Sequence, residues 1–108
     1  MATTNIINKG IHCKVCVHGS GLSAGTDYTA VLYYSASKAE YRASATATAT
    51  DTTTDGEIVT SCIFDFTPEQ TEQLKAGNVM LEVYDTNTLQ QMVYNDTFAT
   101  VRSTSLSK

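Results

Sequence analysis

The sequence has little charge, no tryptophan and no long apolar run. Charged residues make up 17% of the 108 positions, and the seven basic side chains are scattered through a chain with a formal net charge of -4. This distribution argues against nucleic acid as a direct partner, because phosphate binding requires clustered Lys and Arg. No segment approaches the roughly 20 apolar residues of a membrane helix, so the sequence predicts no membrane partner either.

The cysteine count and the N-terminal residues argue against a secreted, disulfide-bonded protein. Cys13, Cys16 and Cys62 are an odd number of cysteines, and we expect them to be reduced. Residues 1–5 lack a basic region followed by an apolar stretch, so we expect no signal peptide and synthesis in the cytoplasm. The length predicts a single domain over residues 1–108.

An alternation of apolar and polar residues with a period of two dominates the chain, which is typical of β-strands. Thr, Ser and Ala fill many of the positions that charged residues usually take. We predict an all-β fold, an antiparallel β-sandwich of about seven strands. The predicted strands are 11–17, 28–35, 41–50, 57–66 and 78–85, and residues 91–95 and 97–102 supply one or two final strands. Residues 51–56 are predicted to form a loop that closes on a turn-forming Asp55-Gly56 pair.

Several of these strands carry apolar rows that we assign to the core. The strongest row is Ile58, Cys62, Phe64 and Phe66. Residues 28–35 have large apolar side chains on both sides of the strand, which predicts a central position in the sheet. The remaining rows are Ile11, Cys13, Val15 and Val17, then Val79, Leu81 and Val83, and finally Val93, Phe98 and Val101.

One short helical turn is predicted near residues 67–75. Thr67 can cap it with its hydroxyl, and the only proline of the chain, Pro68, falls at the first helical position, where its missing N–H is not needed. Gln70 completes a capping box by reaching back to the N–H of the cap. Gly77 is expected to supply the positive φ that ends the turn.

Residues 41–50 alternate alanine with serine or threonine after Tyr41-Arg42. The weak core signal predicts an edge strand, where small residues and hydroxyls are tolerated. An edge strand of small residues allows close approach, so we predict contact with another protein or another copy. Tyrosine is enriched at interfaces, and two tyrosines complete the candidate set. The candidate interface residues are Ala45, Thr46, Ala47, Thr48, Thr50, Tyr33 and Tyr41.

The segment from His12 to His18 has the residue types of a metal or redox site. Zinc prefers Cys and His ligands, and His12, Cys16 and His18 share one side of an extended strand. Cys13 and Cys16 would face opposite sides, and no distant second ligand pair exists, so we expect no metal and no cofactor. A reactive cysteine requires a helix N-terminus, which does not follow here. No motif for a nucleophile, phosphate loop or acid–base pair is complete, so we do not expect an enzyme.

A carbohydrate- or ligand-binding module is the alternative class that the sequence leaves open. Some of the six tyrosines must fill a core without tryptophan, and others remain for a surface site. This alternative predicts a concave site where at least two tyrosines converge with polar groups. The candidates are Tyr28, Tyr33, Tyr41 and Tyr94.

A strand, a capped turn, a glycine and a second strand ending in Tyr-Asp follow one another within residues 58–101. The turn is Phe66-Thr67-Pro68-Glu69-Gln70-Thr71-Glu72-Gln73-Leu74, followed by Gly77 and by Val83-Tyr84-Asp85. This succession resembles the immunoglobulin-like domains of tailed-phage structural proteins and is similar to the baseplate upper protein N-terminal domain family. The chain departs from the family pattern at Thr86-Asn87-Thr88, where a glycine-centred hairpin is usual, and in its Ala/Thr strand.

The resemblance implies an immunoglobulin-like sandwich that acts as a non-enzymatic assembly module. It implies a tail, baseplate or head accessory protein in a virion, made in the bacterial host cytoplasm. Its partners would be other virion proteins or further copies of itself, with a homo-oligomer as one outcome. No catalytic residues carry over from the family.

Overall fold

The computed structural model of this protein describes residues 5–19, 21–34 and 42–103. These residues form eight strands and one helix. The elements are β1 (Asn5–Asn8), β2 (Cys13–His18), β3 (Asp27–Tyr33), β4 (Ala43–Thr48), β5 (Thr50–Thr54), β6 (Glu57–Phe66), α1 (Pro68–Glu72), β7 (Gly77–Asp85) and β8 (Gln91–Arg102). Among the described residues, no helix has both the length and the hydropathy that a membrane-crossing segment needs.

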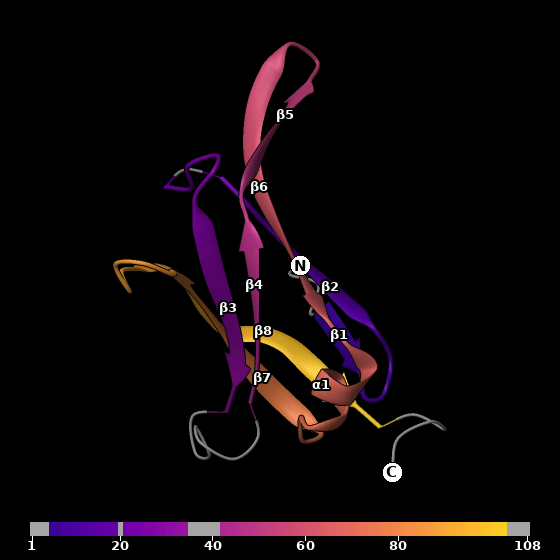
Figure 1. The fold of residues 1–108 in the computed structure, drawn as a ribbon. Helices are drawn as coiled ribbons and strands as arrows, with labels where there is room; N and C mark the ends of the chain where they lie inside the picture. The colour runs from indigo at the N-terminus through magenta and orange to yellow at the C-terminus, as the bar shows by residue number, and fades with distance from the viewer. Residues whose placement is uncertain (1–4, 20, 35–41, 104–108) are drawn as a thin grey trace.

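Two sheets pack against each other, so the predicted all-β sandwich is confirmed (Figure 1). The large sheet has the strand order β1-β8-β7-β3-β4, and the small sheet has the order β2-β6-β5. In immunoglobulin terms, β2, β6 and β5 correspond to strands B, E and D, and β8, β7, β3 and β4 to strands G, F, C and C′. All pairs are antiparallel except β1 and β8, which run parallel.

The predicted central position is confirmed for β3, and the predicted edge position is confirmed for β4. β3 lies between β7 and β4, and β4 is the last strand of the large sheet. The strand that we predicted over residues 41–50 ends at Thr48, because Thr50 begins β5 in the small sheet. β1 and β5 are additional strands, and residues 91–102 form a single strand, which is one of the two predicted outcomes.

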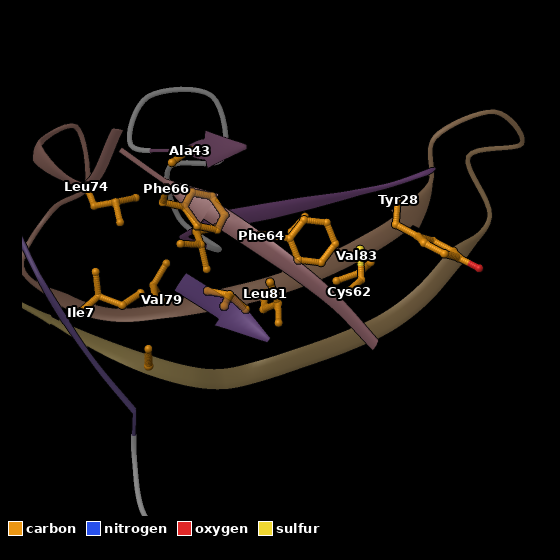
Figure 2. Packing of buried hydrophobic residues seen from close by; sticks show 14 of the residues in the cluster. Ile7, Tyr28, Ala43, Cys62, Phe64, Phe66, Leu74, Val79, Leu81 and Val83 are labelled. Carbon is orange, nitrogen blue, oxygen red and sulfur yellow. The ribbon is translucent and has the colours of Figure 1, made fainter. Parts of the chain in front are cut away.

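The core lies between the sheets and contains most of the predicted apolar rows. Cys62, Phe64 and Phe66 are at most 1% exposed, and Figure 2 shows their side chains between the two layers. The row Val79, Leu81 and Val83 is also buried. In the row 11–17 only Val15 is buried, because β2 is an edge strand of the small sheet and Ile11 lies before it begins.

The assignment of Ile58 to the core is wrong, since its side chain is 71% exposed. The predicted loop 51–56 is wrong as well, because residues 50–54 form β5 and pair with β6. Asp55 and Gly56 have positive φ values of 50° and 80°. Positive φ at both central residues is typical of a two-residue hairpin turn. The resulting hairpin, residues 50–59, is called the arm here. Figure 1 shows that the arm projects past β3 and β4, so no opposing sheet covers it.

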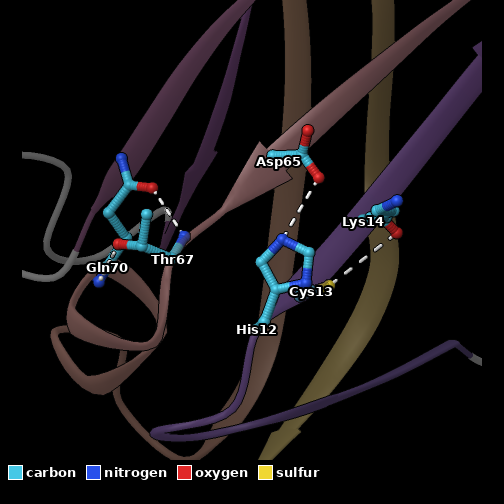
Figure 3. Close-up of polar contacts among 6 residues, drawn as sticks. All are labelled: His12, Cys13, Lys14, Asp65, Thr67 and Gln70. Atoms are coloured by element: carbon cyan, nitrogen blue, oxygen red, sulfur yellow. Dashed lines mark hydrogen bonds and ion pairs between the residues drawn. The ribbon is translucent and has the colours of Figure 1, made fainter.

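The helix α1 closes the opposite end of the sandwich, and its predicted capping box is confirmed (Figure 3). Gln70 donates its backbone N–H to Thr67 Oγ1 at 3.2 Å, and Thr67 donates its N–H to Gln70 Oε1 at 2.8 Å. The buried Thr71 donates its hydroxyl to the Ile11 carbonyl at 2.9 Å, which joins α1 to the segment just before β2. Gly77 has the expected positive φ of 132°, but it begins β7, and Gln73 is the C-terminal cap of the helix.

Candidate functional site

The outer face of the large sheet is the side turned away from the small sheet. In β3, Tyr28, Ala30 and Leu32 are buried against the core, so the alternate side chains of Thr29, Val31 and Tyr33 lie on the outer face. The register then places Glu82 of β7 beside Val31, and Tyr94 of β8 beside Glu82.

A polar network lies at the centre of this outer face. Tyr33 is only 5% exposed, and its side chain is hydrogen bonded to the Glu82 carboxylate. Burial, followed by this hydrogen bond and the negative charge of Glu82, raises the pKa of Tyr33 well above its ordinary value. Gln91 donates from Nε2 to Glu82 Oε1 at 2.7 Å. Glu82 is therefore held by two neighbours, and Tyr33 remains protonated at neutral pH.

A pocket of about 300 Å³ opens beside this network. It has an aliphatic wall, two phenol rings, one guanidinium and one carboxylate, so it can accept an amphipathic group through ring contact and hydrogen bonds. Its described lining residues include no Ser–His or Cys–His pair of the kind that acyl transfer uses. Its lining residues are Val31, Tyr33, Arg42, Glu82 and Tyr84.

The free edge of β4 borders the same face. Along a strand, successive residues point their N–H and C=O groups to opposite edges. Ala49 is hydrogen bonded to Thr26 and Gly25 on the β3 side, so the backbone groups of residues 44, 46 and 48 point away from β3. Gln70 Nε2 donates to the Ser44 carbonyl at 2.6 Å and covers one end of the edge. Within the described residues, β4 has no strand neighbour on this side beyond that point.

Hydroxyl groups hold the outer face of β4 in place. Thr29 Oγ1 lies 3.2 Å from Thr46 Oγ1 and 2.8 Å from Thr86 Oγ1. Thr48 donates its hydroxyl to the Asp27 carboxylate, in the position directly opposite on β3. These contacts hold the hydroxyl groups of Thr46 and Thr48 in place along the edge.

The predicted interface residues do not all share one surface. Thr46 and Thr48 are exposed on the outer face, whereas Ala45 and Ala47 are half-buried and pack against the core cluster. Thr50 is exposed, but it begins β5 in the small sheet and does not share this face. Tyr33 lies beneath the outer face and lines the pocket, and Tyr41 lies outside the described residues.

The tyrosines of the carbohydrate alternative also separate. Tyr33 and Tyr94 share the outer face, and Tyr94 is 54% exposed. Tyr28 does not belong to it, because its ring is buried between the sheets and its hydroxyl accepts a hydrogen bond from Ser23 N at 2.8 Å. The expected convergence is therefore reduced to Tyr33 and Tyr94 among the described residues.

Sequence reasoning missed Val31, Arg42, Glu82 and Tyr84 as members of the site. The signal for two of them was present, because Glu82 and Tyr84 alternate with the buried Leu81 and Val83 and so must face outward. Their cross-strand neighbours depend on the register, which the sequence pattern does not give.

The residues considered for a metal site are not brought together. His12 lies 3.1 Å from the Asp65 carboxylate (Figure 3), while Cys16 and His18 continue along β2 opposite Ile63 and Ser61. Across the described ranges, no group of three or more His, Cys, Asp or Glu is placed to hold a metal ion. The cysteines at 13, 16 and 62 are free thiols.

Comparison of this chain with protein-family models, curated proteins and solved structures gives no match.

Proposed function

We propose that this protein is a non-enzymatic interaction module that binds a protein partner through the outer face of the large sheet and the adjoining edge of β4. The observation that carries the proposal is the coincidence of two features on one side of the sandwich. The first feature is the pocket, which is lined by tyrosine and valine side chains and by the hydrogen-bonded Glu82. The second feature is the edge strand β4, which has backbone N–H and C=O groups that point away from β3. Together they supply side-chain anchors and main-chain hydrogen bonds.

The assembly context rests on the motif resemblance alone. The capped turn from Phe66 to Leu74 and the strand ending in Tyr84-Asp85 support a tailed-phage structural protein, with other virion proteins as the partners. The virion is accordingly the proposed location. The sandwich fold agrees with this proposal, but many unrelated functions use the same fold.

The direct test measures binding to the purified virion proteins encoded beside its gene. Tyr84→Ala and Tyr94→Ala should each weaken the Kd at least about tenfold, which corresponds to about 1.4 kcal/mol. Ile63→Ala is the matched control, since Ile63 is 51% exposed on β6 of the small sheet. Equal loss in all three variants, or no binding to any virion protein, would contradict the proposal.

A second pair of variants separates edge pairing from side-chain contact. Thr46→Pro removes an N–H that points away from β3, and proline is tolerated at such edge positions. Thr46→Val keeps the N–H and removes only the hydroxyl. If the partner adds a strand to β4, Thr46→Pro should abolish binding and Thr46→Val should retain it. If both variants retain binding, the partner contacts the side chains of the outer face and does not pair with the backbone of β4.

A small carbohydrate is the second candidate ligand, and the pocket beside Tyr84 is the observation that favours it. Its volume of about 300 Å³ lies at the lower end of the range for small-molecule sites. Glycan-array binding that disappears in Tyr84→Ala and persists in Ile63→Ala would support this candidate. Binding to no glycan would leave the protein partner as the only occupant.

A further inference from the structure

We propose that the arm of one copy docks into the pocket between β1 and β2 of a second copy, with Ile58 as the anchor and with Asp51, on the same side of the arm, facing Lys14. This contact uses neither the outer face of the large sheet nor the edge of β4. It therefore adds a self-association surface to the interaction module proposed above and does not depend on that proposal.

The arm carries an exposed apolar side chain with no sheet packed against it. Ile58 follows the same alternation along β6 as the buried Cys62 and Phe64, yet it is 71% exposed. The difference arises because the arm extends beyond the opposing sheet (Figure 1). Two-stranded hairpins without further packing are marginal in water, so an arm of this kind is stabilised when a partner covers it.

The receiving pocket lies where the edge strands of the two sheets meet. It has a volume of about 210 Å³, which is below the usual size of a small-molecule site and suits one side chain. Ile7 and Val15 form its buried floor, and Ile6 at its rim is 52% exposed. The other lining residues are Asn5, Cys13, Lys14, Cys16 and Phe98.

The charges of the two surfaces are complementary. Asp51, Asp55 and Glu57 give the arm three carboxylates, and residues 50–59 contain no basic side chain. Asp51 is opposite Thr60 in the register and lies on the same side of the arm as Ile58, whereas Glu57 lies on the other side. Lys14 lines the pocket, is exposed and has no ion-pair partner within the described residues. Asp65 is opposite Lys14 in the register, but its carboxylate contacts His12 at 3.1 Å. Opposite charges around an apolar anchor fix the orientation of docking.

The arm and the pocket are different surfaces of one chain, so the contact can be reciprocal or one-way. If two copies exchange arms, both pockets are filled and a symmetric dimer results. If each copy passes its arm to the next copy, a ring or a filament results.

Sedimentation velocity over a range of protein concentrations tests the association. The wild type should self-associate, and Ile58→Asp and Lys14→Glu should each weaken association at least about tenfold, or about 1.4 kcal/mol. The charge swap Asp51→Lys/Lys14→Glu should restore association. Leu89→Asp is the control, since Leu89 is 73% exposed and lies between β7 and β8, outside both the arm and the pocket. A monomeric wild type at every concentration, or a swap that fails to restore association, would overturn the proposal.

Disulfide trapping tests the location of the contact. Cys16 lines the pocket and is exposed, so Ile58→Cys should form an intermolecular disulfide with the Cys16 of the next copy under mild oxidation. The docking predicts a covalent species that is linked between positions 58 and 16, as identified by peptide mass spectrometry. The double variant Ile58→Cys/Cys16→Ser should lose this linkage. An unchanged yield of covalent species after Cys16→Ser, or a product without the linkage between positions 58 and 16, would contradict the proposed docking.

The two proposals fail separately. Tyr84→Ala and Thr46→Pro affect the outer face and should leave the disulfide between positions 58 and 16 intact. Ile58→Asp should weaken self-association and leave one-to-one binding of a virion protein to the outer face unchanged.

Discussion

Strand β6 passes through two regions that differ in what lies opposite them. In the sandwich body, Cys62, Phe64 and Phe66 are at most 1% exposed, whereas Ile58 in the arm is 71% exposed. All four follow one alternation, and all four are apolar. The period of a strand therefore determines which side chains share a side, and the presence of an opposing sheet determines whether that side is buried.

The largest expected difference between body and arm is in the free energy of unfolding. Phe64→Ala should lower it by about 3–5 kcal/mol, because a fully buried ring is replaced by a cavity. Ile58→Ala should change it by less than about 0.5 kcal/mol in the monomer. Urea denaturation at low protein concentration measures both values. A loss above about 2 kcal/mol for Ile58→Ala would show that the arm packs against its own body.

The closed end of the body gives the next largest effect. Thr71 is 0% exposed and donates its hydroxyl to the Ile11 and Pro68 carbonyls. Thr71→Val keeps the shape but leaves the Ile11 carbonyl without this donor, which should cost about 1–3 kcal/mol. Thr71→Ser keeps the hydroxyl and should retain more of the stability than Thr71→Val. If both variants are equally stable, the hydrogen bond does not hold this end closed.

A substitution in the turn of the arm should destabilise the arm and leave the stability of the sandwich body unchanged. Gly56 has a φ of 80°, with open space around its Cα, so Gly56→Ala suffers from backbone strain and not from a clash. The left-handed conformation costs a non-glycine residue about 1–2 kcal/mol. Hydrogen exchange should accelerate at the amides of β5 and remain unchanged in β7. Gly56→Asn is the control, because asparagine tolerates this conformation better, and it should exchange more slowly than Gly56→Ala.

The smallest effect at neutral pH comes from Tyr33, which belongs to the body, whereas the arm has no tyrosine. Burial and Glu82 raise the pKa of Tyr33, so the folded state keeps a proton that the unfolded state loses near pH 10. The stability is fully present below that pH and falls as the pH rises further. Tyr33→Phe should therefore flatten the loss of stability above about pH 10, as measured by urea denaturation across the alkaline range. An unchanged slope would contradict the environment assigned to Tyr33.

Much of the architecture was predictable because local rules agreed with the tertiary fold. The capping box of Thr67 and Gln70 needs only residues three apart, and it forms as the sequence predicts. The row Val79, Leu81 and Val83 depends on strand period alone, and all three side chains are buried. β5 was missed because its exposed threonines carry no apolar alternation, and its pairing with β6 follows from the Asp55-Gly56 turn.

The candidate site was less predictable than the fold. The outward direction of Thr46 and Thr48 follows from their alternation with alanine, and the edge position of β4 was also expected. The pocket beside them depends on which residues of β3 and β7 are neighbours. Val31 and Glu82 are far apart in the chain and become adjacent only through the register of two non-consecutive strands.

The sequence by itself determined the period of each strand, the helix cap at Thr67, the hairpin turn at Asp55-Gly56 and the low charge of the chain. These features depend on residues that are close along the chain. Only the tertiary structure decided that Ile58 is exposed, that Tyr33 lies beneath a sheet face and that β1 runs parallel to β8. The physical reason is that burial and pairing depend on segments distant in sequence, whose distance and register no local pattern encodes.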